Sequence, residues 1–133
     1  SLSLSDSEID KAKSEITNFM IEPKFKELLF KYIDRTNLKD SQVYKQAQVD
    51  RRVFSKIKNE DNYHPSKETI IKLALALKLS LEELNNLLKS ADYSLPENTY
   101  FNIAIIYCFK NRIYDIEQVN DILYACDLSL LTK

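Results

Sequence analysis

Glycine is absent from this chain of 133 residues, where about 9 would be usual at this length. Phosphate-binding and dinucleotide-binding loops need Gly at fixed positions, so the absence argues against P-loop and dinucleotide-binding folds. It also argues against many tight β-hairpins, which need positive φ. We expect asparagines to take the left-handed turn positions instead. The candidates are Asn37, Asn59, Asn62 and Asn111.

Cysteine and histidine are also scarce, with two Cys and one His. Cys108 and Cys126 lie in apolar helical patterns without CxxC spacing, so we interpret both as buried, reduced thiols, which fits a cytoplasmic protein. His64 precedes Pro65 in a polar loop, away from any other His or Cys. We therefore expect no metal and no cofactor. We also expect no enzyme, because no nucleophile with a base and no framed carboxylate pair is visible.

No apolar run reaches the roughly 20 residues that a membrane-spanning helix needs, so we expect no membrane partner. Hydrophobic residues make up 44% and charged residues 29% of the chain, which is typical of an ordinary globular domain. The net charge of −1 hides an uneven distribution. Residues 22–64 hold ten basic and seven acidic side chains, whereas residues 97–133 hold three basic and five acidic ones. A nucleic-acid contact would need such a basic excess.

The patterning divides the chain into three parts. Residues 1–21 form a linker or a short N-terminal helix: residues 1–8 are Ser-rich and lack a pattern. Residues 9–21 follow, with apolar residues at helical spacing, namely Ile9, Ala12, Ile16, Phe19 and Met20. Residues 22–92 form the main domain, and residues 93–133 form an appended helical extension that packs on it or provides a dimer contact.

The main domain is predicted to hold five helices, so the fold class is all-α. They span about 24–36, 40–47, 51–58, a stretch after Ser66, and 81–89. Asp40 or Ser41 is the expected cap of the second helix, because Lys39 is a poor cap. The other expected N-caps are Asp50, Ser66, and Ser80 in a capping box with Glu83.

The extension is predicted to add two helices. Residues 100–109 are apolar almost all round, which indicates a helix buried on more than one side, with a β-strand as the alternative. Asp115 is expected to cap the last helix. Its expected inward residues are Ile116, Val119, Ile122, Leu123 and Cys126.

The stretch Leu38–Asn59, LKDSQVYKQAQVDRRVFSKIKN, indicates two short helices joined by a tight turn, the second of them basic. The apolar stripe breaks between Ala47 and Val49, which places the turn. In a DNA-reading helix-turn-helix, the first helix supports the second, and the second presents cations to the DNA. In the major groove, Arg51 and Arg52 would reach bases or phosphates first; the alternative is an ordinary solvated helix face. The candidate nucleic-acid-binding residues are Arg51, Arg52, Ser55, Lys56, Lys58 and Asn59.

Residues 24–88 resemble the lambda-repressor-like helix-turn-helix domain of the Cro or XRE type. The match rests on the spacing of Leu38, Val43, Ala47, Val49, Phe54 and Ile57, on PS followed by TI at 65–70, and on LSLEEL at 79–84. The resemblance implies a five-helix core and a transcriptional regulator that binds double-stranded DNA. Gln48 and Asn37 stand where that family commonly has Gly, and Tyr44 replaces a small residue.

A closer resemblance is to a helical C-terminal module that follows macro domains and other enzymatic domains in some bacterial proteins. It rests on YKQAQVDRRVFSKIKNEDNYHPSKETIIKLALAL and the later YDIEQVNDILYACDLSLL. The resemblance implies that residues 1–21 end an interdomain connection. It also gives the alternative function: a non-enzymatic interaction or adaptor module that keeps the fold without reading DNA, with a partner surface at Phe101, Tyr114 or Tyr124 within residues 97–131.

Overall fold

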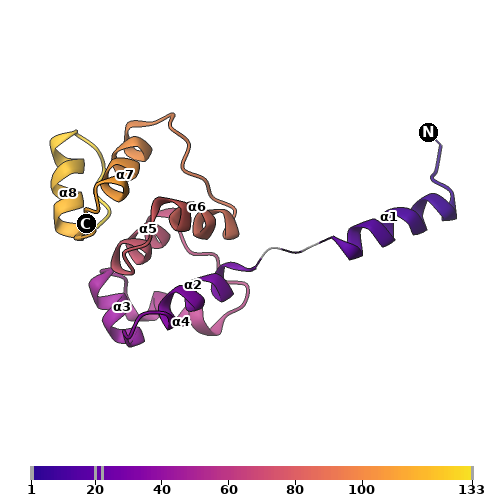
Figure 1. The fold of residues 1–133 in the computed structure, drawn as a ribbon, viewed down its shortest axis with the longest axis horizontal. Coiled ribbons are helices and arrows are strands. Elements are labelled where there is room, and N and C mark those ends of the chain that lie inside the picture. Colours follow the sequence, from indigo (N-terminus) through magenta and orange to yellow (C-terminus); the bar gives the residue numbers. More distant parts are fainter. Residues whose placement is uncertain (1, 20, 22, 133) are drawn as a thin grey trace.

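The computed structural model describes residues 2–19, 21 and 23–132. Within these residues the chain forms eight helices and no strand (Figure 1). The predicted all-α class is therefore confirmed. Ser1, Met20, Glu22 and Lys133 lie outside the described residues, and so does the expected place of Met20 on the N-terminal helix.

Five helices build the central part: α2 (Phe25–Asp34), α3 (Asp40–Gln46), α4 (Arg51–Asn59), α5 (Lys67–Ala76) and α6 (Leu81–Ser90). For α2, α3, α4 and α6, whose two ends were predicted, the observed ends lie within two residues of the predicted ones. Helix α5 lies at the centre, in contact with α3 and α6, and α6 also contacts α2. Its buried residues surround the helix instead of lining one face, as expected for a central element: Ile70, Ile71, Leu73, Ala74 and Leu75.

Helices α7 (Tyr100–Lys110) and α8 (Ile116–Ala125) continue the same core. The β-strand alternative for residues 100–109 is wrong, because they form α7. Helix α7 contacts both α6 and α8. The chain end folds back on α8, where Asn120 Oδ1 accepts from the Leu131 backbone N–H at 2.9 Å. One continuous apolar cluster therefore extends from α2 to Leu131.

The two cysteines differ from the prediction. Cys108 is a buried free thiol, and burial raises its pKa. Cys126 is a free thiol too, but it is exposed. Its expected inward position is wrong because α8 ends at Ala125, so Cys126 is the C-cap residue and leaves the buried stripe.

Most helix starts follow the expected capping chemistry. The side chains of Asp50, Ser66, Ser80 and Asp115 each accept a backbone N–H from the first turn. The expected cap of α3 is wrong. Lys39 occupies that N-cap position, and Gln42 Oε1 accepts from the Lys39 backbone N–H at 2.8 Å. The Gln42 side chain, inside the first turn, therefore satisfies the backbone N–H of the N-cap residue.

The left-handed turn positions are not the predicted asparagines. Positive φ occurs at Gln48, Lys78, Asp92, Arg112 and Asp127, with values between 53° and 64°. Each residue follows a helix end and precedes an apolar residue whose N–H reaches back into the helix, as when Leu79 donates to the Ala74 carbonyl at 3.1 Å. This is the Schellman arrangement. The left-handed residue is the one directly before the apolar residue that packs on the core. Asn111 is therefore the C-cap with φ of −101°, and Arg112, which precedes Ile113, has the left-handed conformation.

These strained positions predict a stabilising substitution. Left-handed φ costs a non-Gly residue roughly 1–2 kcal/mol, whereas Gly adopts it freely but loses more chain entropy. Lys78→Gly and Asp127→Gly should each raise the free energy of unfolding by about 0.5–1 kcal/mol, measured by urea denaturation. Lys31→Gly, at an exposed position inside α2, is the matched control and should lower it by about 1 kcal/mol. Destabilisation at both turn positions would contradict this explanation.

Helix α1 (Asp6–Asn18) begins earlier than the expected amphipathic stretch. Ser5 and Glu8 form a capping box, with the Glu8 backbone N–H donating to Ser5 Oγ at 3.2 Å. The prediction that residues 1–8 lack a pattern is therefore wrong, because Ser5 and Glu8 form the capping-box signature Ser-x-x-Glu. No residue of α1 is buried, and Figure 1 shows it standing away from the packed helices.

Glu83 links α6 to α2 with its two oxygens. Glu83 Oε1 accepts from the Ser80 backbone N–H at 2.9 Å, and Oε2 pairs with Arg35. The hydrogen bond from Arg35 is the main cause that lowers the pKa of Glu83 below its usual 4.5. The stability that this pair contributes is therefore present above pH 4.5 and is lost as the pH falls through the lowered value.

Glu83→Gln keeps a side chain that suits the capping box but removes the charge. Since the Arg35 side chain is half exposed, we expect a loss of about 0.5–1 kcal/mol in the free energy of unfolding at pH 7. The difference from the wild type should shrink as the pH falls below 4.5. Urea denaturation at several pH values measures it, and a difference that grows in acid would contradict the assignment.

No helix within the described residues has the length and apolar character that crossing a membrane requires.

Candidate nucleic-acid interface

Helices α3 and α4 form a compact unit held by buried apolar residues. Val43 on α3 and Phe54 and Ile57 on α4 are at most 3% exposed. The Tyr44 ring packs against Phe54 with 5.5 Å between centroids, and Phe30 of α2 approaches Phe54 from another side at 5.9 Å. Tyr44, which replaces a small residue of the resembled family, thus fills space beside α4. The packing fixes α4 on a rigid support.

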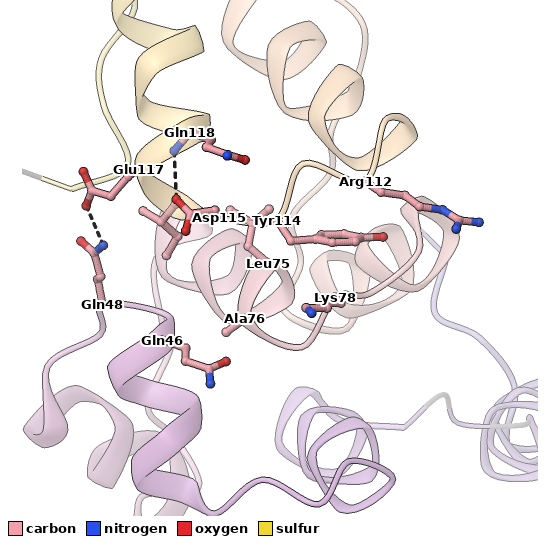
Figure 2. Close-up of a pocket in the computed structure, with 11 residues that line it drawn as sticks. Gln46, Gln48, Leu75, Ala76, Lys78, Arg112, Tyr114, Asp115, Glu117 and Gln118 are labelled. Atoms are coloured by element: carbon pink, nitrogen blue, oxygen red, sulfur yellow. Dashed lines mark hydrogen bonds between the residues drawn. The ribbon is translucent and has the colours of Figure 1, made fainter.

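The turn between α3 and α4 is held from outside by two other helices. Gln48 has φ of 53°, and the Val49 backbone N–H returns to the Tyr44 carbonyl at 2.9 Å. Lys72 Nζ of α5 donates to the Gln48 carbonyl at 3.4 Å. Gln48 Nε2 donates to Glu117 Oε1 of α8 at 2.8 Å (Figure 2). A Gly at this position would adopt positive φ more easily but would have no side chain to bond to Glu117. Gln48 therefore connects the α3–α4 turn to the appended helices at the cost of a less favourable backbone conformation.

The outward side of α4 carries every residue that the sequence suggested as a nucleic-acid contact. All six are exposed: Arg51, Arg52, Ser55, Lys56, Lys58 and Asn59. Five of them recur at i, i+1, i+4, i+5 and i+8, which places them on one side of a helix. Phe54 and Ile57 face the core. The structure therefore brings the predicted residues together on one uncovered surface, which we call the α4 face.

The cations of the α4 face have only weak intramolecular partners. Lys58 Nζ lies 2.7 Å from Asp40 Oδ2 of α3, and Arg52 Nε lies 3.4 Å from Asp50 Oδ1. Lys56 Nζ stands 5.9 Å from the centre of the Tyr63 ring. Exposed ion pairs of this kind contribute about 0–1 kcal/mol. A phosphate group that approaches these side chains therefore has to replace only weak interactions.

Asp50 limits where an anion can bind. Its Oδ1 accepts from the Arg52 backbone N–H at 2.7 Å, and this bond is the first cause that holds the pKa of Asp50 below its usual value. Its carboxylate is therefore charged at neutral pH and occupies the N-terminal end of α4. The helix terminus is unsuited to phosphate, so the side chains of Arg51 and Arg52 must provide the first contacts.

A pocket of about 480 Å³ lies where the α3–α4 turn, the end of α5 and the α7–α8 turn meet. In Figure 2, Lys78 and Arg112 stand on one side and Asp115 and Glu117 on the other. The carboxylates are already engaged, since Asp115 Oδ1 accepts from the Gln118 backbone N–H at 3.1 Å and Glu117 accepts from Gln48. Among the described residues, no group of three or more His, Cys, Asp or Glu is placed to hold a metal ion. The pocket therefore lies where three parts of the chain contact one another: the α3–α4 turn, the end of α5 and the α7–α8 turn.

Comparison with protein-family models, with curated proteins and with solved structures found no match to this chain.

Sequence reasoning missed three residues that shape this interface. Asp40 was assigned only as a possible cap, yet it holds Lys58 of the next helix. Tyr63 lies under Lys56, and Glu117 holds the turn from α8. The first contact follows from placing α3 against α4. The other two connect separate elements and carry no local sequence signal.

Proposed function

We propose that this chain is a DNA-binding domain of a Cro/XRE-like transcriptional regulator, with a lambda-repressor-like core of α2–α6 and α7–α8 as an appended pair. The supporting observation is the α4 face, where six polar side chains, four of them cationic, are exposed together. The Asp50 cap and the packing of α3 behind α4 add rigidity to that surface. The site of action on this proposal is the cytoplasm of a bacterium.

In this proposal α4 lies in the major groove of double-stranded DNA. The groove is about 12 Å wide and admits an α-helix. Arg51 and Arg52 enter first and contact base edges or phosphates, and Ser55 and Lys56 follow one turn later. Lys58 and Asn59 lie near the phosphate backbone. A bidentate contact from Arg to guanine would contribute roughly 1–3 kcal/mol of discrimination.

Nuclear magnetic resonance tests where DNA binds. We expect that titrating a mixed-sequence duplex into ¹⁵N-labelled protein shifts or broadens the amide signals of residues 50–59 and of the α3–α4 turn first. Signals of α7 residues such as Ile103 and Tyr107 serve as the internal control and should stay in place. Changes confined to α7 and α8 would contradict the proposed orientation.

A protein-interaction or adaptor module appended to an enzymatic domain is the second proposal, and a different surface supports it. Tyr100, Ile103 and Tyr107 are 81%, 45% and 54% exposed, and they follow one another at i, i+3 and i+7 along α7. Of the three partner residues expected from the sequence, Tyr124 is 76% exposed, whereas Phe101 and Tyr114 are partly buried against the core. This proposal expects no duplex binding even at low salt, and it expects Tyr107→Ala to weaken capture of the partner.

A further inference from the structure

Helix α1 has an apolar stripe without any partner in the described part of the chain. Ile9 and Ile16 are 49% and 73% exposed, and Ala12 lies between them on the same side of the helix. Phe19, the C-cap residue directly after α1, is 78% exposed and continues the spacing. The spacing of 3, 4 and 3 residues is the a/d pattern of a coiled coil. A lone helix of 13 residues is marginal in water even with good helix formers. Its capping box fixes only its start, so a second helix is needed to cover the stripe.

We propose that α1 pairs with α1 of a second copy of this chain, parallel and in register. Ile9 and Ile16 take the a positions and Ala12 the d position between them, and Phe19 follows at the next d spacing, directly after the end of α1. In that arrangement each apolar residue meets its own counterpart across the pair, and the stripe is covered along its whole length.

The charges beside the stripe select the parallel orientation. Glu8 takes a g position and Lys13 the next e position. A parallel, in-register pair therefore places Glu8 opposite Lys13 of the second copy, and the two-fold symmetry repeats that contact. An antiparallel pair that aligns the same four apolar residues brings Lys13 near Lys13 and Glu15 near Glu15. Opposite charges thus meet in one orientation and like charges in the other.

The pair is a weak dimer by its size. The 13 residues of α1 make up fewer than two heptads, whereas three or four heptads give a self-sufficient coiled coil, so the association depends strongly on concentration. Figure 1 shows α1 standing clear of the packed helices, which include α4. The inference does not depend on DNA binding, since it is measured without nucleic acid.

Sedimentation equilibrium from about 10 µM to about 1 mM protein covers the range of weak association. The wild type should pass from monomer to dimer within this range. Ile16→Asp removes one a position and should keep the chain monomeric throughout. Ser14→Asp adds the same charge at the outward f position and should associate as the wild type does. Equal association of Ile16→Asp and the wild type, or a wild type that is monomeric at every concentration, would overturn the proposal.

Disulfide trapping tests the orientation. In a Cys126→Ser background, which leaves only the buried thiol of Cys108, Ala12→Cys places a thiol at a d position that meets itself in the parallel pair. Mild oxidation should give a disulfide-linked dimer, and adding Ile16→Asp should slow its formation at least about tenfold. A dimer that is lost in both Ile16→Asp and Tyr107→Asp, with no disulfide from Ala12→Cys, would mean that α1 docks on α7 and would overturn the proposal.

Discussion

Replacing Arg51 and Arg52 together by Ala should lower the affinity for duplex DNA by at least about 30-fold, because each Arg contact contributes roughly 1–3 kcal/mol. Both side chains are exposed, and the Asp50 cap uses the backbone N–H of Arg52. The double variant therefore keeps the start of α4 and should remain folded. Fluorescence anisotropy with a labelled duplex measures the affinity, and circular dichroism verifies the fold.

Lys31→Ala with Lys110→Ala is the charge-matched control. Both lysines are exposed on α2 and α7, and their removal changes the net charge by the same amount. We expect no more than about a threefold loss of affinity, since the control tests only the long-range charge. Normal binding by the folded Arg51 and Arg52 variant would contradict the assignment to α4. An equal loss of affinity in both double variants would mean that only the overall charge of the protein attracts DNA.

Ile105→Ala should lower the free energy of unfolding by about 2–5 kcal/mol, because Ile105 is fully buried and Ala leaves a cavity. The affected residue lies on α7, yet its cluster includes residues from α2 to α8. We therefore expect α2–α8 to unfold in one transition, at a lower urea concentration than in the wild type. Urea denaturation followed by circular dichroism measures both properties.

Ile103→Ala is the matched control on the same helix. Ile103 is 45% exposed, so its truncation should change the free energy of unfolding by less than about 0.5 kcal/mol. Two separate transitions in the Ile105→Ala variant would contradict the continuous core and would make the extension an independent unit. An equal loss in the free energy of unfolding for Ile103→Ala and Ile105→Ala would contradict the burial of Ile105.

The helices were predictable from the sequence wherever apolar spacing and caps agreed. Asp50, Ser66, Ser80 and Asp115 each precede a helical stripe, and each accepts a first-turn N–H in the structure. For helix α7 the spacing left two alternatives, because apolar residues on all sides fit a strand as well as a buried helix. Length and the Thr99 cap, whose side chain accepts from the Asn102 N–H, distinguish the two.

The turns could not be predicted in the same way. In a chain without Gly, intrinsic preference predicts Asn at the left-handed positions, yet these positions are held by Gln, Lys, Asp and Arg. What selects them is the apolar residue that follows, such as Val49 or Leu79, whose docking on the core fixes the chain direction. Tertiary packing therefore decides these positions, and the intrinsic preference of Asn for left-handed φ is too small to override it.

Only the local part of the candidate site was predictable. The exposure of Arg51, Lys56 and their neighbours follows from helical spacing against Phe54 and Ile57. The contact of Gln48 with Glu117 joins residues far apart in sequence, so it requires the fold. Binding to DNA is a prediction from the charge and geometry of this surface.

Fluorescence anisotropy with a pool of random-sequence duplexes, at low and at physiological salt, tests the central claim most directly. If four cations of α4 neutralise phosphates, the affinity should fall roughly 100-fold between 50 and 200 mM salt. Binding of this kind that disappears in the Arg51 and Arg52 double variant is the predicted result. No binding by the folded wild type at the lowest salt would contradict DNA recognition and favour the adaptor proposal.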